Sequence, residues 1–236
     1  MRNPFAFSLS GVVSGGEIKA ADIGIILDGS KWVRKKNFMR QLELVKLIIR
    51  SFSVSKEEVH FGIATAANDG KVVIQLDAYL DETSLQEAVA KISYPAGRRL
   101  VGKAISKTRD ELFSRGRAGV SKILLIFVGG RSGDGVEVPS TEIKKGGIRV
   151  VVVGMGRKID ETQLVTITSK PEFIIIQRYI QFLTSIIAPL VAKLNEGTDH
   201  LKVAPYNFLK SGKIKNSKPQ NVIQRITIRA SNSVNK

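Results

Sequence analysis

Asp28 and Ser30 are the side chains most clearly placed for chemistry, because they directly follow an apolar run. Residues 23–27 are apolar or glycine, and an aspartate, a glycine and a serine come next. A buried parallel strand presents polar side chains in this way at the carboxyl edge of an α/β sheet, where ligands bind. Short polar residues also cap the turn or helix that follows a strand. The sequence therefore predicts either a ligand-binding edge or a capping role here.

A second set of candidates consists of cationic and aromatic side chains near the same edge. Arg98 and Arg99 lie in a turn-rich loop, and their guanidinium groups suit an anionic ligand. Solvated surface charge is the competing interpretation. Trp32 is either an exposed anchor for a partner or a side chain packed over the edge. The residues that we predict to contact a partner are Lys31, Trp32, Arg98, Arg99, Lys103 and Arg131.

Alternating apolar segments predict the elements that position these residues. Strands are expected at residues 23–27, 59–66, 71–76, 122–128, 148–153 and 173–176. Helices are expected at residues 33–52, 85–92, 102–113, 140–145, 161–168 and 177–194. The alternation predicts an α/β fold with a doubly wound, mainly parallel sheet and helices on both faces. The hairpin around residues 68–70 adds one antiparallel edge strand.

Three regions are expected along the chain. Residues 1–20 are predicted to be a flexible lead-in, residues 21–196 a folded domain, and residues 197–236 a basic tail or linker that is mobile. The tail carries eight lysines and arginines but one acid. It is either an arm that binds polyanions or a charged linker between modules.

The composition narrows the class of function. The chain has 236 residues, 43% of them hydrophobic, a net charge of +16, no cysteine and two histidines. Disulfide scaffolds, zinc ribbons and thiol catalysis are therefore excluded. The positive charge favours polyanionic partners. Few aromatic residues are interleaved with the lysines and arginines of the basic tail, which argues against specific nucleic-acid recognition. No apolar run has the length of a membrane span.

Nothing in the sequence indicates an enzyme. The glycine-rich segment at residues 129–135 does not fit the phosphate-binding pattern G-x-x-x-x-G-K-[ST], and no dinucleotide fingerprint, catalytic triad or acid–base pair is present. A nucleotide-binding enzyme on a doubly wound sheet is therefore the weakest of the functions considered.

In order and spacing, several motifs resemble the von Willebrand factor A domain of the extracellular-matrix type, found in collagen VI and matrilins. They are GIILDGS ending at Ser30, VHFGIA from Val59, the loop and helix from Gly97 to Ile105, KILLIFVGGR from Lys122, and the strand from Ile148 to Gly154. The resemblance covers roughly residues 21–194. It implies a Rossmann-like sheet with an adhesion site at its carboxyl edge.

The resemblance also implies a metal site that this chain keeps only in part. In the family, two serines, a threonine and two aspartates hold a divalent cation, and hard oxygen ligands of this kind suit Mg²⁺, Mn²⁺ or Ca²⁺. Asp28 and Ser30 match two of the five. Trp32, Arg99 and Gly129 stand where the other three ligands belong, and Asp134 is a poor substitute.

We therefore expect no functional metal or other cofactor, with weak Mg²⁺ or Ca²⁺ binding at Asp28 and Ser30 left open. A guanidinium near Asp28 would take the electrostatic place of the metal. The expected function is a non-enzymatic adhesion or matrix-assembly module in a chain of several modules. Its expected partners are collagen-like proteins, acidic matrix proteins or sulfated glycans. The alternative is an intracellular scaffold of the same fold.

An extracellular location follows from the resemblance, and a cytoplasmic one is the alternative. Residues 1–20 lack the hydrophobic stretch and cleavage site of a signal peptide. If the protein is secreted, we expect the sequence to be a mature piece or a fragment.

Overall fold

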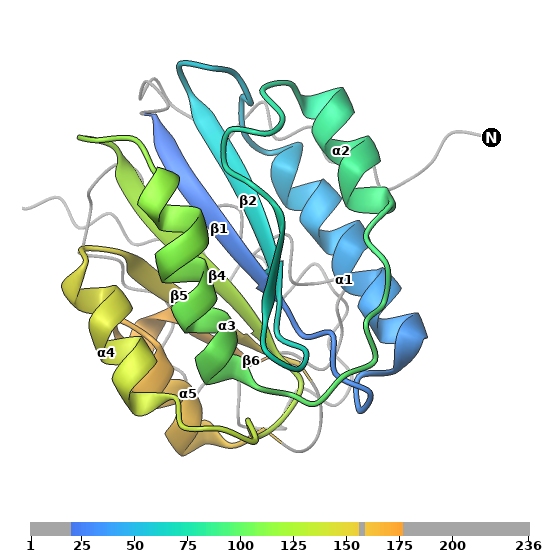
Figure 1. Cartoon of the computed structure of the whole chain (residues 1–236), viewed down its shortest axis with the longest axis vertical. Helices are drawn as coiled ribbons and strands as arrows, with labels where there is room; N and C mark the ends of the chain where they lie inside the picture. The colour runs from blue at the N-terminus through green and yellow to red at the C-terminus, as the bar shows by residue number, and fades with distance from the viewer. Residues whose placement is uncertain (1–19, 156–158, 177–236) are drawn as a thin grey trace, which may run out of the picture.

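The computed structural model describes residues 20–155 and 159–176 (Figure 1). Its strands are β1 (Ala21–Leu27), β2 (Val59–Thr65), β3 (Lys71–Ile74), β4 (Ser121–Val128), β5 (Arg149–Gly154) and β6 (Ile174–Ile176). Its α-helices are α1 (Arg34–Ile49), α2 (Glu82–Ala90), α3 (Val101–Lys107), α4 (Glu137–Lys145) and α5 (Glu161–Ile167). Within these residues no helix is long and apolar enough to cross a membrane.

The six strands form one sheet in the order β3-β2-β1-β4-β5-β6. All neighbouring strands are parallel except β2 and β3, which form the expected antiparallel hairpin. The predicted fold class is therefore confirmed. The strand order reverses direction between β1 and β4, and ligands bind at such a switch point in open α/β sheets.

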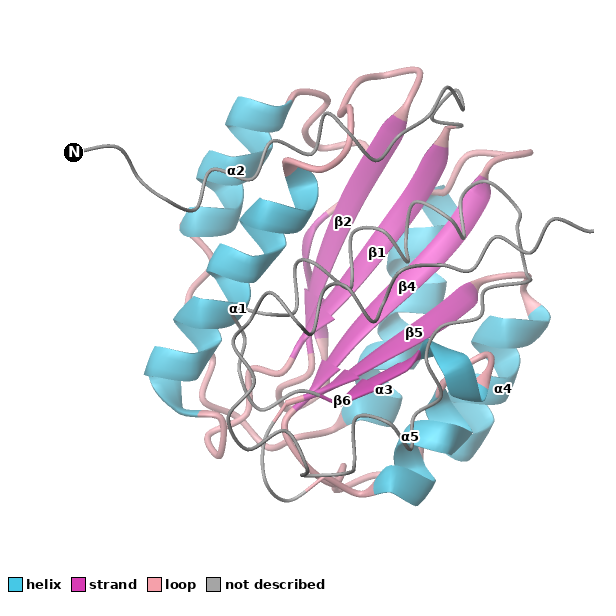
Figure 2. Cartoon of the chain, turned by 180° about the vertical axis from the view of Figure 1, so that it is seen from behind, coloured by secondary structure: helices cyan, strands magenta, loops and turns pink. Residues whose placement is uncertain are grey.

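Helices cover both faces of the sheet, with α1 and α2 on one face and α3, α4 and α5 on the other (Figures 1 and 2). Side chains of β1 alternate between the two faces, as the twofold period of a strand requires. Ile23, Ile25 and Leu27 pack with α1, whereas Ile26 packs with α3. Because both faces are buried, β1 is apolar along most of its length.

The segment after α3 departs from the prediction of one continuous helix over residues 102–113. After α3 ends, a π-helical turn (Thr108–Leu112) and a short 3₁₀ turn (Phe113–Arg115) follow. This segment presses on the sheet at two paired glycines, Gly24 and Gly62. A Cβ on Gly62 would lie 2.3 Å from Leu112 Cδ1, and one on Gly24 would lie 2.8 Å from Phe113 Cζ. The regular helix thus ends where Leu112 and Phe113 pack closely on the sheet. Apolar periodicity in the sequence does not reveal this packing.

Other element boundaries differ from the predictions by a few residues: α2 and α4 each begin three residues earlier than expected. The predicted helix at residues 177–194, the lead-in up to residue 19 and the tail at 197–236 lie outside the described residues. The three-region division therefore remains a prediction.

A buried ion pair fixes the amino-terminal edge of the sheet. Asp22 is fully buried in β1, and Arg117 donates to both of its carboxylate oxygens, from Nε at 2.8 Å and from the backbone N–H at 2.6 Å. The same guanidinium donates to the backbone carbonyls of Ala21 and Glu58 at 2.8 and 2.7 Å. Arg117 thus ties the starts of β1 and β2 together while it compensates the buried charge.

We expect Arg117→Met to lower the free energy of unfolding by about 3 kcal/mol, because the substitution leaves a buried carboxylate without its cation. Arg115→Met is the matched control, since Arg115 pairs with Asp77 in a half-exposed ion pair and should cost less than about 1 kcal/mol. Urea denaturation followed by circular dichroism measures both values. Equal losses in the two variants would contradict the assigned role of Arg117.

Candidate functional site

Sheet topology brings the ends of β1 and β4 together at the carboxyl edge. The two strands are parallel neighbours, in register up to the pair Ile26 and Ile126. Asp28 and Gly129 directly follow these strands and therefore meet at the edge. Asp28 is completely buried there.

Three N–H donors surround the Asp28 carboxylate. Arg99 Nε donates to Oδ2 at 2.7 Å, and the backbone N–H of Gly129 donates to the same oxygen at 2.7 Å. The backbone N–H of Ser30 donates to Oδ1 at 3.0 Å. Asp28 therefore caps the turn that follows β1. The interpretation that it or Ser30 caps the next helix is wrong, because no side chain caps the start of α1.

The Arg99 guanidinium is enclosed on several sides. Only 7% of the residue is exposed, and its Nη1 donates weakly to the carbonyl of Arg131 at 3.4 Å. The Trp32 ring lies over it, with 5.5 Å between Arg99 Cζ and the ring centroid. Arg99 and Asp28 thus form an ion pair that is shielded from solvent by the indole.

Trp32 has two roles in this arrangement. One face of its ring covers Arg99, yet 57% of the residue remains exposed. Lys31 Nζ lies 5.1 Å from the centroid of the same ring. The two interpretations drawn from the sequence, an exposed anchor and a cover over the edge, are therefore compatible.

Two side chains that the sequence analysis missed hold the Asp28 loop in place. Gln41 is buried in α1, and its amide exchanges hydrogen bonds with the Asp28 backbone N–H and C=O at 2.9 and 3.0 Å. Tyr94 donates its hydroxyl proton to the Ser30 carbonyl at 2.9 Å. The sequence could have identified Gln41, because this polar residue interrupts the apolar stripe of α1 between Phe38 and Leu42. No sequence pattern identifies Tyr94.

Gly129 is required by close packing at the ion pair. A Cβ at this position would lie 2.9 Å from Asp28 Oδ2, 2.9 Å from Val33 Cγ2 and 3.2 Å from Arg99 Nη2. The two shortest distances are to the ends of the Asp28 and Val33 side chains, so a larger residue at position 129 would have to displace these side chains and would also crowd Arg99.

Asp134 plays a structural part beside the site. Its carboxylate accepts hydrogen bonds from the backbone N–H groups of Gly102 and Lys103 at 3.1 and 2.8 Å, at the start of α3. Ser132 supports the same turn by accepting from the Val101 N–H at 2.8 Å. Asp134 is thus committed to the first turn of α3 and has no contact with the Asp28 ion pair.

Of the remaining residues that we predicted to contact a partner, some lie beside Trp32 and others pair with acids elsewhere. Arg98 is exposed in the loop beside Trp32, where the Lys31 N–H donates to the Gly97 carbonyl at 2.9 Å. The side chain of Arg131 pairs with Asp160 at 3.3 Å. Lys103 pairs with Asp69 at 2.5 Å. The structure therefore brings together Lys31, Trp32 and Arg99, with Arg98 on the adjoining loop, whereas Arg131 and Lys103 are engaged elsewhere.

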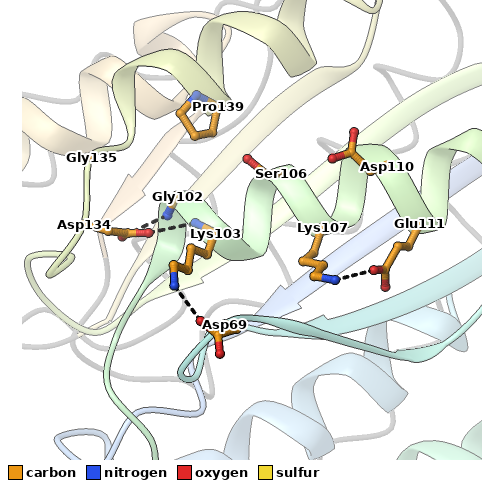
Figure 3. Close-up of a pocket in the computed structure, with 10 residues that line it drawn as sticks. All are labelled: Asp69, Gly102, Lys103, Ser106, Lys107, Asp110, Glu111, Asp134, Gly135 and Pro139. Carbon is orange, nitrogen blue, oxygen red and sulfur yellow. Dashed lines mark hydrogen bonds and ion pairs between the residues drawn. The ribbon is translucent and has the colours of Figure 1, made fainter.

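A pocket of about 430 Å³ lies along α3 (Figure 3). Its charges are paired internally, since Lys103 bonds Asp69 and Lys107 bonds Glu111, both at 2.5 Å. The hydrogen bond from Lys103 lowers the pKa of Asp69, and the bond to Glu111 raises the pKa of Lys107. Both shifts are consequences of the pairing, so the two lysines that line this pocket are already paired with carboxylates.

Backbone strain is concentrated at the Asp28 edge. Among residues 20–155 and 159–176, three non-glycine residues have positive φ: Arg34 at 66°, Asn68 at 54° and Ala96 at 53°. Arg34 begins α1, whereas Asn68 and Ala96 flank the contact in which the Asn68 N–H donates to the Arg98 carbonyl at 2.8 Å. Such strain costs of order 1 kcal/mol per residue and concentrates at functional sites.

The donor set at this edge does not fit a divalent cation. Among the described residues, Asp28 supplies the one carboxylate at the ion pair, and its oxygens already accept three N–H donors. The Ser30 hydroxyl is buried with no partner among the described residues, but the neighbouring cation is the Arg99 guanidinium. Over the described ranges, no group of three or more His, Cys, Asp or Glu side chains is arranged to hold a metal.

Comparisons with known proteins agree on the fold. A family model described as the von Willebrand factor type A domain matches residues 22–189. Matrilin-1 of Gallus gallus is 29% identical over 161 residues, covering 67% of this chain and 32% of matrilin-1. The collagen alpha-1(XXI) chain of Xenopus laevis is 26% identical over 224 residues, covering 87% of this chain and 23% of that protein. The chain thus spans a third or less of these curated relatives.

A solved structure from another matrix protein has the same fold. Proximal thread matrix protein 1 from the mussel byssus, described as having a zinc-occupied MIDAS motif, has a TM-score of 0.67 and 20% identity to this chain. The match covers 74% of this chain and 48% of that one. At this identity the likeness establishes the fold alone.

We expect Arg99→Met to lower the free energy of unfolding by about 3 kcal/mol, because Asp28 then stays buried without a cation. Arg98→Met is the matched control. Its exposed side chain makes no ion pair with a described residue, so the loss should stay below about 0.5 kcal/mol. Urea denaturation followed by tryptophan fluorescence measures both losses. Equal stability of the two variants would refute the idea that Asp28 depends on Arg99.

Proposed function

Because this chain belongs to the von Willebrand factor type A domain family, we propose that it is a metal-independent adhesion module of the extracellular matrix. Arg99 supplies, from within the chain, the positive charge that the family's metal supplies to the first-strand aspartate. The module performs no catalysis. It binds a matrix partner, either a collagen-like protein or an anionic glycan, at the Asp28 edge.

The ion pair between Arg99 Nε and Asp28 Oδ2, 2.7 Å apart and almost fully buried, is the observation that carries this proposal. A guanidinium satisfies a carboxylate by charge-assisted hydrogen bonds and cannot be deprotonated in a protein. It also offers no open coordination position to a partner's carboxylate, as a metal would. Recognition at this edge must therefore use the side chains around the ion pair.

The surroundings of the ion pair support a binding role. Trp32 is more than half exposed at the edge, and exposed tryptophans are frequent anchors of binding energy. The strained residues Arg34 and Ala96 lie in the two segments that flank it. The matrix proteins among the relatives, matrilin-1 and collagen alpha-1(XXI), support an extracellular setting.

Solid-phase binding tests the metal-free part of the proposal. We expect the chain to bind immobilised fibrillar collagen or heparin equally well with EDTA and with Mg²⁺. The control is the same assay on Trp32→Ala, which should weaken binding about fivefold in both buffers, since it removes the exposed anchor. Binding that EDTA abolishes would contradict the proposal.

Calorimetry with Mn²⁺ directly tests whether the Arg99 guanidinium takes the place of a metal ion. We expect no heat of binding for the natural chain. We expect binding for a variant carrying Trp32→Ser, Arg99→Thr and Gly129→Asp, which restores the missing oxygens and removes the competing guanidinium. Circular dichroism verifies that the variant is folded, and Asp28→Ala in its background should abolish the heat. A micromolar site in the natural chain that Asp28→Ala removes would overturn the proposal.

A further inference from the structure

Six exposed cations gather beside Trp32 on two neighbouring segments. We define the α1 basic surface as Lys31, Arg34, Lys35, Lys36, Arg40 and Arg98, all of which are exposed. The first five lie in the loop before α1 and in its first two turns. Arg98 joins them through the loop contact in which the Lys31 N–H donates to the Gly97 carbonyl. The surface thus adjoins the indole face of Trp32.

No acid balances these charges. Residues 29–42 contain five lysines and arginines and no aspartate or glutamate, and residues 91–101 contain three cations and no acid. Within the part of the chain that the structure describes, no carboxylate pairs with any of the six. The nearest acid along α1 is Glu43, which already pairs with Lys46 at 2.8 Å.

The arrangement is unfavourable for the isolated domain. Helices α2, α4 and α5 each carry a glutamate in their first turn, whereas α1 begins with Arg34 and has no acid there. Cations near a helix N-terminus oppose the helix dipole, and clustered like charges repel. An anionic partner with several charges would remove both costs at once.

From the unpaired charge and the exposed indole together, we propose that the α1 basic surface and Trp32 bind a sulfated glycosaminoglycan. This inference rests on the proposed function and narrows its partner class. Sulfate and carboxylate groups of the glycan pair with the lysines and arginines. The C–H face of one sugar ring packs on the exposed part of the Trp32 side chain, beside Lys31, whose Nζ lies 5.1 Å from the ring centroid.

The pattern of side chains favours a glycan over an acidic protein. A protein interface needs an apolar core surrounded by polar groups, but here one tryptophan stands among six cations. Flexible lysine and arginine side chains along two turns suit a linear polyanion of high charge density. Sparse aromatics give no stacking platform for successive bases, as single-stranded nucleic acid would require.

Binding to immobilised heparin in EDTA, measured with the full chain by biolayer interferometry over a range of salt, tests the inference. We expect Lys35→Ala, Lys36→Ala and Arg40→Ala together to weaken binding at least about tenfold. The salt slope, which is the slope of log affinity against log salt concentration, should become shallower by about two to three. Alanine keeps the helix intact. The matched control, Lys56→Ala with Lys71→Ala and Lys145→Ala, removes three exposed cations elsewhere, and should weaken binding less than about twofold.

Trp32 has its own expected signature. Trp32→Ala should weaken heparin binding about fivefold without changing the salt slope, because stacking involves no counterion release, and Trp32→Phe should restore most of the loss. An unchanged affinity for Trp32→Ala would overturn its part in the site. Thermal unfolding verifies that each variant is folded.

Three results would overturn the glycan assignment: equal weakening by the α1 and control triples, equal competition by duplex DNA of matched charge, or equal binding to phosphatidylserine vesicles. The first indicates unspecific charge, and the others indicate a different polyanion. None of them bears on the metal-free role of Arg99, which the Mn²⁺ calorimetry tests without any glycan. Failure of the inference and failure of the proposed function are therefore distinguishable.

Discussion

The carboxylate of Asp28 lies wholly buried at the end of β1, and a buried charge requires a compensating cation. Arg99 meets this requirement at 2.7 Å. The position of Trp32 over the guanidinium and the absence of a side chain at Gly129 both keep the ion pair enclosed. The carboxyl edge is thus organised around one internal ion pair.

β1 carries a buried aspartate at each end, and an arginine from a distant segment compensates each one. At the amino-terminal edge, Arg117 pairs with Asp22 and also donates to three backbone carbonyls. At the carboxyl edge, Arg99 pairs with Asp28 beneath an exposed indole. The first arrangement ties strand ends together, whereas the second is surrounded by strained backbone and unpaired cations. This contrast is why we assign a binding role to one edge and a structural role to the other.

The proposed replacement of a metal by a guanidinium would change how a partner is recognised. A metal offers an open coordination position, which draws in a carboxylate of the partner. An enclosed guanidinium offers none, so we propose that contact shifts to the exposed ring of Trp32 and to the lysines and arginines at the start of α1. The proposed surface selects by charge density and stacking, with an affinity that depends on salt concentration.

The sequence by itself determined the fold class, because apolar periodicity fixes which segments become strands or helices and which faces they bury. It also located Asp28 and Ser30, since strand ends in a parallel sheet converge on one edge. The family resemblance placed Trp32, Arg99 and Gly129 beside them. Composition and periodicity could not separate Arg98 from Arg99, which are identical neighbours in a loop.

Only the tertiary structure decided that Arg99 turns inward to Asp28 while Arg98 stays exposed. It likewise paired Lys103 with Asp69 and Arg131 with Asp160. It also placed the Gln41 amide against the Asp28 backbone. The physical reason is that such pairings depend on distances between segments far apart along the chain, which local periodicity and composition do not encode.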